Sequence, residues 1–168
     1  VNGFKPVTIG LDDYFVDREK TPRDENGDYD FESLEAIDYK LFQHHVSELL
    51  AGNEIELPKF DFVSGKSSPS GHFMKLKDHQ ILIAEGIHGN NPKLTESIAS
   101  KDKFRVYIAP MTQLNLHRHD RVPASDTRLI RRIVRDSLFR GYTANDTLKQ
   151  WKSVRAGETK NIFPYQET

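Results

Sequence analysis

Acidic residues follow two apolar runs of the chain at positions where they could do chemistry. Asp12 and Asp13 come after the run 7–11 (VTIGL), and Glu85 interrupts the run 80–87 (QILIAEGI). Both runs are typical of buried strands, and ligands of open parallel sheets gather at the carboxyl ends of strands. A carboxylate there can bind Mg²⁺ or accept a hydroxyl proton, although a single acid is also typical of a turn.

A second candidate is the arginine-rich segment 125–141 (SDTRLIRRIVRDSLFRG), which contains five arginines. At about 100° per residue, a helix would group four of them on one face. These are Arg128, Arg131, Arg132 and Arg135. The other face would carry Leu129, Ile130, Ile133, Val134 and Leu138. This pattern predicts an apolar face anchored in a core and a guanidinium face that binds phosphate oxygens. The alternative is a solvated helix whose arginines pair with Asp126 and Asp136.

Composition limits the class of ligand and the location. The 168 residues carry a net charge of −1, so a protein dedicated to a nucleic-acid backbone is disfavoured and a small phosphorylated ligand is favoured. The absence of cysteine excludes disulfides and thiolate metal sites. The sequence has no apolar run of membrane-spanning length, and its length suits a single domain over 1–168. We therefore expect a cytoplasmic protein with no membrane partner.

The remaining pattern predicts strands that alternate with helices. Strands are expected at 7–11, 80–87 and 104–109, and helices at 31–50, 112–121, 125–141 and from Thr143 onward. Thr143 and Asp146 have the spacing of a capping box. A strand at 54–62 and its return at 72–76, joined by the turn 63–71, predict a small hairpin appendage within 54–77. Strand and helix alternation indicates an α/β fold with a parallel sheet. Acids at strand ends followed by an arginine helix indicate phosphoryl transfer.

Four motifs in this order resemble the uridine kinase group of nucleoside kinases, which are relatives of phosphoribulokinase and bacterial pantothenate kinase. They are LDDYF at 11–15, KFDFVSGK at 59–66, AEGIHG at 84–89 and DTRLIRRIVRD at 126–136. The resemblance covers nearly all of the chain. It implies the three-layer, P-loop NTPase-like α/β fold, a cytoplasmic enzyme of pyrimidine salvage, and ATP with Mg²⁺ as the phosphoryl donor.

The resemblance also implies roles for individual residues. Asp12 matches the carboxylate that accepts the proton of the nucleoside 5′-hydroxyl, and Glu85 matches the acid near Mg²⁺. The arginines of 125–141 (Arg128, Arg131, Arg132 and Arg135) match a lid that closes over the phosphates. The residues implied around the sugar and base are Phe15, Tyr29, Asp30, Phe60 and Phe62. From spacing alone, Phe60 and Phe62 on one strand face are also typical of a core.

The chain departs from this family pattern in two places. Well-studied uridine kinases have a histidine shortly after the aromatic pair, where this chain has Gly65 followed by Lys66, so the acceptor remains open. The loop G-x-x-x-x-G-K-[ST], which holds the β- and γ-phosphates, is not in the sequence. We therefore expect a fragment truncated at both ends, inactive and without tight ATP binding by itself. A gap is expected between the strands that precede Asp12 and Glu85, with unpaired edges that favour homo-oligomers.

Three hypotheses follow. The first is an ATP-dependent kinase of a uridine- or cytidine-type nucleoside, of which this chain is the acceptor and lid portion. The second is a non-catalytic module that binds a phosphorylated metabolite, a nucleotide or RNA through the arginine face. The third is a kinase of the same fold that acts on a non-nucleoside hydroxyl.

Overall fold

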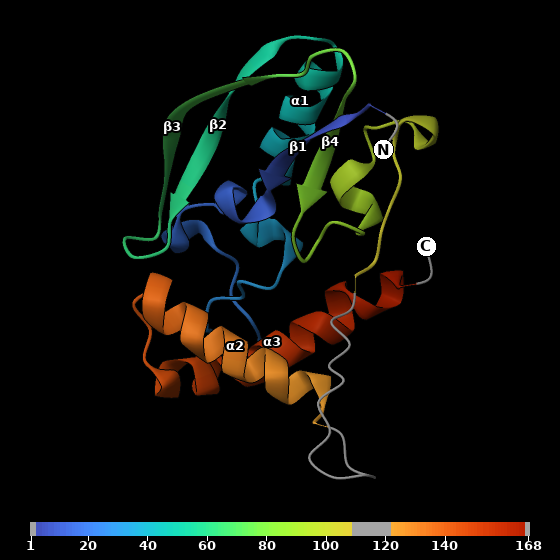
Figure 1. Ribbon diagram of the computed structural model, residues 1–168. Helices are drawn as coiled ribbons and strands as arrows, with labels where there is room; N and C mark the ends of the chain where they lie inside the picture. Colours follow the sequence, from blue (N-terminus) through green and yellow to red (C-terminus); the bar gives the residue numbers. More distant parts are fainter. Residues whose placement is uncertain (1–2, 109–121, 167–168) are drawn as a thin grey trace.

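The computed structural model describes residues 3–108 and 122–166 as a mixed α/β structure. Its strands are β1 (Lys5–Gly10), β2 (Glu54–Asp61), β3 (Lys66–Lys75) and β4 (Gln80–Glu85). Its helices are α1 (Tyr39–Leu50), α2 (Ala124–Phe139) and α3 (Ala144–Asn161). The strands and α1 form one part of the molecule, and α2 and α3 lie across the end toward which β1 and β4 point (Figure 1).

The parallel strands β1 and β4 pair directly with each other. Their register matches Lys5 with Gln80 and Gly10 with Glu85, so the acids after β1 and at the end of β4 meet at one edge. The expected gap between these two strands is therefore wrong. The intervening α1 and hairpin provide the crossover that a parallel pair requires, and pairing satisfies the facing backbone groups of both strands.

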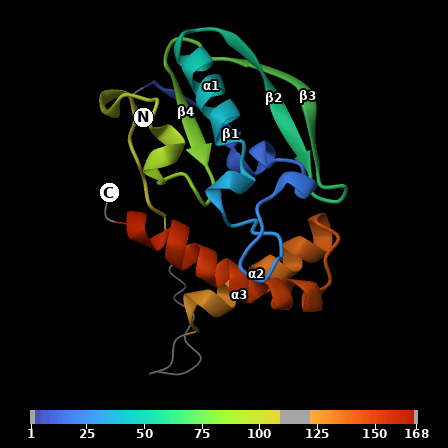
Figure 2. The same ribbon diagram turned by 180° about the vertical axis from the view of Figure 1, so that it is seen from behind.

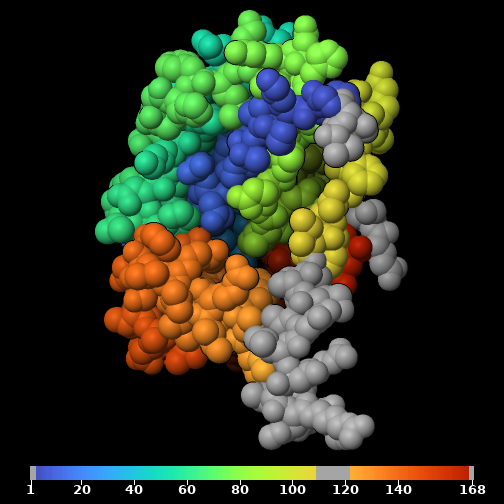
Figure 3. All heavy atoms as spheres, in the orientation of Figure 1, coloured from blue at the N-terminus to red at the C-terminus, as the bar shows by residue number. Residues whose placement is uncertain are grey.

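Helix α1 covers one face of this sheet, as the view from behind shows (Figure 2). Phe42, Val46 and Leu49 of α1 belong to the buried cluster that includes Ile9 of β1. On the opposite face, Ile81 and Ile83 of β4 are exposed, and the residues of β1 are uncovered in Figure 3. In the described residues, the sheet therefore has helical cover on one face rather than the two that a three-layer arrangement requires.

The antiparallel hairpin β2–β3 is longer than the sequence predicts. Pairing runs from Glu54 with Lys75 to Asp61 with Lys66, with an irregularity between Glu56 and Pro58. The turn therefore occupies residues 62–65 rather than 63–71. Gly65 ends it with a φ of +71°, a conformation that glycine adopts without the steric cost of a side chain. Because Gly65 provides the reversal, the Ser-rich residues that follow it can enter β3.

The predicted helix 31–50 is only partly correct. Residues 34–36 form a short 3₁₀ turn, and the α-helix begins at Tyr39. Asp38 caps it by accepting a hydrogen bond from the backbone N–H of Leu41 at 2.9 Å. Ser33 and Asp38 each bond to a backbone N–H and so start a new helical segment. The apolar periodicity therefore does not produce one continuous helix from residue 31.

The strand predicted at 104–109 is not formed within its described residues, 104–108. Phe104, Val106 and Ile108 are exposed, and no strand of the described residues pairs with them. The backbone of an extended segment forms its strand hydrogen bonds only with a neighbouring strand. Alternation of apolar and polar residues is therefore not sufficient to form a strand at 104–108. Residue 109 and the helix predicted at 112–121 lie outside the described residues.

Helix α2 confirms the predicted helix, but the predicted orientation of its faces is only partly correct. Leu129 and Ile133 are half-buried as expected, but so are Arg128 and Arg132, whereas Arg131 and Arg135 are exposed. Ile130, Val134 and Leu138 are 62%, 53% and 68% exposed, whereas Asp136 is 1% exposed. Arg128 and Arg132 pack inward because carboxylates from neighbouring segments meet them there, as the contacts below show. The predicted capping box of α3 is confirmed, with Thr143 and Asp146 bonded reciprocally.

None of the helices in the described ranges is long and apolar enough to cross a membrane.

Candidate active site

A cavity of about 490 Å³ lies where the acid-bearing loop after β1 meets the hairpin, α2 and α3. It brings together seven residues that the sequence singled out from four separate segments. They are Asp12, Phe15, Tyr29, Phe60, Phe62, Arg132 and Arg135. Asp30, Glu85, Arg128 and Arg131 do not line it. The strand-end acid, the aromatic residues and half of the arginine face thus share one pocket, and the lining combines a carboxylate, aromatic rings and guanidinium groups.

Asp12 faces an arginine that received no role from the sequence. Nη2 of Arg140 donates a hydrogen bond to Oδ2 of Asp12 at 3.2 Å. Burial and the nearby Arg135 guanidinium lower the pKa of Arg140, while Asp12 and Asp136 act in the opposite direction. Asp12 is half-exposed, so it remains accessible to a hydroxyl that enters the pocket while Arg140 orients it.

Three phenylalanines form an aromatic wall in this cavity. The ring centroids of Phe60 and Phe62 are 5.1 Å apart, and Phe15 lies 5.5 Å from Phe60 and 6.0 Å from Phe62. Phe60 is buried, and the guanidinium carbon of Arg140 lies 4.3 Å from the centroid of the Phe62 ring. The rings pack on one another, as in a core, and also line the cavity, so their role around a base stays a prediction. Such a wall suits a flat ring that stacks.

Tyr29 and Asp30 have different positions relative to the cavity. Tyr29 lines it and stacks under the guanidinium of Arg23, whose carbon lies 4.3 Å from the ring centroid. Oδ1 of Asp30 accepts a hydrogen bond from the backbone N–H of Glu32 at 3.1 Å, which stabilises the turn beside the pocket. Asp30 therefore shapes the segment that carries Tyr29.

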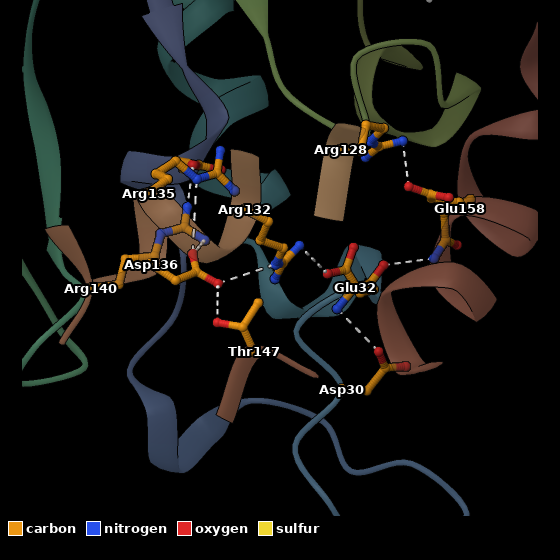
Figure 4. A network of polar contacts seen from close by, with 11 residues as sticks. Asp30, Glu32, Arg128, Arg132, Arg135, Asp136, Arg140, Thr147 and Glu158 are labelled. Carbon is orange, nitrogen blue, oxygen red and sulfur yellow. Dashed lines mark hydrogen bonds and ion pairs between the residues drawn. The ribbon is translucent and has the colours of Figure 1, made fainter. Parts of the chain in front are cut away.

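Buried Asp136 connects three of the arginines that line the cavity (Figure 4). Its carboxylate oxygens lie 3.4 Å from Nε of Arg132, 3.4 Å from Nη1 of Arg140 and 4.0 Å from Nε of Arg135. The hydroxyl of Thr147 on α3 donates a further hydrogen bond to Asp136 at 3.2 Å. The carboxylate thus compensates guanidinium groups that would otherwise repel one another.

A second buried acid, Glu32, attaches residues 30–32 to these helices. Oε1 of Glu32 lies 3.5 Å from Nη1 of Arg132, so Arg132 bridges Glu32 and Asp136 (Figure 4). Burial raises the pKa of Glu32, and the Arg132 charge opposes that rise. Asn161 of α3 donates a hydrogen bond to the backbone oxygen of Glu32 at 2.6 Å. Residues 30–32 are therefore held against both α2 and α3.

Gly157 allows this close packing, which gives a testable expectation. A Cβ at position 157 would lie 2.4 Å from Cβ of Glu32, inside van der Waals contact. We expect Gly157→Ala to lower the free energy of unfolding by about 1–3 kcal/mol, since the loop must move away from α3. Urea denaturation measures this, with Lys152→Ala on the exposed side of α3 as the control. An unchanged Gly157→Ala protein would contradict the packing described.

Arg128 and Arg131 line a different cavity, of about 330 Å³. It shares Arg132 and Arg135 with the first cavity and adds Trp151 of α3. Arg128 pairs with Glu158, which also accepts a hydrogen bond from Arg155 at 2.7 Å. The predicted arginine face is thus divided. Arg128 and Arg131 line only the second cavity, whereas Arg132 and Arg135 line both.

Glu85 lies beside Asp13 rather than in the aromatic cavity. A Cβ built on Gly10 would be 3.4 Å from Oε1 of Glu85 and 3.9 Å from Oδ2 of Asp13. Burial and the charge of Asp12 raise the pKa of Asp13, and its contact with the Phe60 backbone opposes them. Carboxylate oxygens are donors that Mg²⁺ prefers, and the metal role of Glu85 stays a prediction. Among the described residues, no group of three or more acidic or histidine side chains is placed to hold a metal ion.

Sequence reasoning missed several residues of the first cavity. Arg140 is the fifth arginine of the predicted helix, but it lies off the face that the periodicity grouped and reaches the pocket from the helix end. Arg18 begins a short 3₁₀ turn and Glu32 lies in a loop, where periodicity gives no signal. Their charge in otherwise polar segments was the only sequence signal, and it does not distinguish a pocket from solvent.

Comparisons with known proteins agree with the motif-based resemblance. Residues 7–167 match the phosphoribulokinase / uridine kinase family. The chain is 26% identical over 152 residues to a uridine kinase of Mycoplasma genitalium, covering 90% of this chain and 62% of that protein. It is 25% identical over 152 residues to a uridine kinase of Halobacterium salinarum, covering 90% of this chain and 60% of that protein. It is 27% identical over 157 residues to uridine-cytidine kinase B of Dictyostelium discoideum, covering 93% and 57%. The chain thus spans about three fifths of the length of these relatives.

Proposed function

Since the chain belongs to the phosphoribulokinase / uridine kinase family, we propose that it binds a uridine- or cytidine-type nucleoside and takes part in phosphoryl transfer from ATP to the 5′-hydroxyl. In this proposal the chain supplies the acceptor-binding and lid parts of the kinase. The observation that carries it is the single cavity where Asp12, paired with Arg140, meets an aromatic wall and two further arginines. A nucleoside needs these three features, for its hydroxyl, its base and the incoming phosphate.

The proposed roles follow from the chemistry of each side chain. The base stacks against Phe15, Phe60 and Phe62, which line the cavity as adjacent rings. The sugar lies near Tyr29 and the turn that Asp30 stabilises. The 5′-hydroxyl donates its proton to the carboxylate of Asp12, which orients the nucleophile and removes the proton as the new bond forms.

The arginines neutralise the charge of the transferred group. Arg132 and Arg135 line both cavities, so phosphates bound on the side of Arg128 and Arg131 would share these two groups with the acceptor. Because guanidinium groups bind phosphate oxygens in a bidentate manner, the four arginines suit the phosphates of the donor. Glu85, with Asp13, would hold Mg²⁺, which neutralises phosphate charge when it is bound.

The second candidate function rests on the second cavity. Arg128, Arg131, Arg132 and Arg135 gather there with Trp151, a combination that also suits a nucleotide or RNA bound without chemistry. The paired Asp12 and Arg140 in the adjoining cavity favour the kinase, since a binding module has no need of a proton acceptor beside the aromatic wall.

Nucleoside binding tests the acceptor side of the proposal. We expect Phe62→Ala to weaken uridine binding about tenfold or more, because base stacking on one aromatic ring contributes about 1–3 kcal/mol. Titration calorimetry of the chain with uridine measures this. Phe73→Ala on β3 is the control, since Phe73 is an exposed ring of the same hairpin that does not line the cavity. Equal uridine affinity in the Phe62→Ala and wild-type chains would reject the aromatic wall as the base site.

A further inference from the structure

The turn of the β2–β3 hairpin lies directly under the side chain of Arg18. The backbone N–H of Arg18 donates to the oxygen of Gly65 at 2.9 Å, and Nη2 of Arg18 donates to the oxygen of Phe62 at 2.7 Å. Both acceptors belong to the turn that follows the aromatic residues of β2. Arg18 is therefore fixed to the end of the aromatic wall, although it comes from a short 3₁₀ turn more than forty residues earlier in the chain.

The position of Arg18 depends on the absence of a side chain at residue 65. A Cβ on Gly65 would lie 2.8 Å from both Cζ and Nε of Arg18 and 2.9 Å from its Cβ. Gly65 is buried, and its φ of +71° also disfavours other residues. Gly65 thus has a second role besides the turn, because the Arg18 side chain occupies the space that a side chain at residue 65 would need.

Arg18 keeps unused hydrogen-bonding capacity in the cavity. It lines the pocket with Phe15, Phe60 and Phe62. Its Nε is buried and has no hydrogen-bond partner among the described residues, and the one side-chain hydrogen bond described for it uses Nη2. A guanidinium has five N–H donors and no acceptor, and a buried donor without a partner is costly. Because Nε packs against Gly65, a ligand in the cavity would meet the terminal nitrogens of Arg18, for which the described residues give one hydrogen bond, from Nη2 to the oxygen of Phe62.

From these contacts we infer that Arg18 determines specificity by donating hydrogen bonds to a carbonyl oxygen at position 4 of the acceptor's pyrimidine ring. A ring stacked on the aromatic wall directs its edge, rather than its face, toward neighbouring polar groups. A donor-only group binds a carbonyl oxygen there and gives nothing to an amino group at the same position. The site would then prefer a uracil-type ring to a cytosine-type ring. This inference rests on the proposed function, since it assumes that a nucleoside occupies the cavity.

The test compares uridine and cytidine binding in matched variants by titration calorimetry of the chain. We expect the wild type to prefer uridine, and Arg18→Met to weaken uridine binding about tenfold while changing cytidine binding less than about twofold. The control is Lys20→Met, which removes a neighbouring exposed cation that does not line the cavity and leaves the ratio unchanged. Gly65→Ala keeps Arg18 but displaces it, and it should shift the ratio in the same direction as Arg18→Met.

The outcomes separate this inference from the proposed function. An equal fall in uridine and cytidine affinity in Arg18→Met would make Arg18 a structural support of the wall and would overturn the inference alone. A wild-type preference for cytidine that Arg18→Met abolishes would also overturn it. Failure of the wild-type chain to bind either nucleoside would overturn the proposed acceptor class and the inference together. If Gly65→Ala fails to fold, as circular dichroism would show, Arg18→Met alone decides.

Discussion

Asp12→Asn is expected to lower the rate of phosphoryl transfer by about 10²- to 10⁴-fold, measured in a chain that also carries a phosphate-binding loop. Asparagine has nearly the shape of aspartate, so it preserves the pocket, and its amide oxygen can still accept the hydrogen bond of Arg140. It cannot accept the hydroxyl proton at the moment of attack. Turnover with uridine and ATP should therefore fall steeply, while uridine and ATP binding change little.

The conservative variant Asp12→Glu tests whether the effect belongs to the carboxylate. Glutamate keeps the proton acceptor and displaces it by one methylene group, so it should retain more activity than asparagine. Calorimetric titration of both variants with uridine shows whether the acceptor still binds. If Asp12→Asn turns over at the wild-type rate, Asp12 is not the proton acceptor, and its pairing with Arg140 serves only to position the arginine.

Asp136→Ala is expected to have the largest effect on stability, about 3–5 kcal/mol in the free energy of unfolding. Asp136 is 1% exposed and lies within 4.0 Å of Arg132, Arg135 and Arg140. Removing it leaves those partly buried guanidinium groups with less negative charge to compensate them, and it removes the acceptor of the Thr147 hydroxyl. Urea denaturation at neutral pH measures the change.

Asp126→Ala provides a matched control for Asp136→Ala on the same helix. Asp126 lies in the first turn of α2, is exposed, and accepts a hydrogen bond from neighbouring Ser125 at 3.2 Å. We expect the control to change the free energy of unfolding by less than about 1 kcal/mol. A loss of similar size in Asp126→Ala and Asp136→Ala would show that the buried carboxylate does not compensate the arginines.

The arginine helix shows how far periodicity predicts a site. The spacing of Arg128 to Arg135 correctly predicted a helix, and the structure has one from Ala124 to Phe139. The spacing could not predict which face packs inward. That orientation depends on Glu32 and Glu158, which come from segments distant in the sequence and meet the arginines only in the folded chain.

The acidic residues illustrate the opposite case. Asp12 and Glu85 were placed at the ends of two strands by short apolar runs, and the in-register pairing of β1 with β4 brings those ends together. Short, nearly continuous apolar runs indicate buried strands, so the local sequence pattern was enough to predict these two strands. The run 104–108 had the same alternation but found no partner strand in the described residues, and it remained irregular.

By itself, the sequence determined the helix of arginines, the capping box at Thr143, the two parallel strands with their terminal acids, and the order of motifs that indicates the family. These features depend on neighbours within a few residues, where backbone geometry fixes which side chains share a face. Only the tertiary structure decided that Arg140 meets Asp12, that Arg132 meets Glu32, and that Arg18 fills the space that Gly65 leaves open. Each of these contacts joins residues that are far apart along the chain. Local sequence pattern therefore cannot predict them, and they form only when folding brings the side chains together.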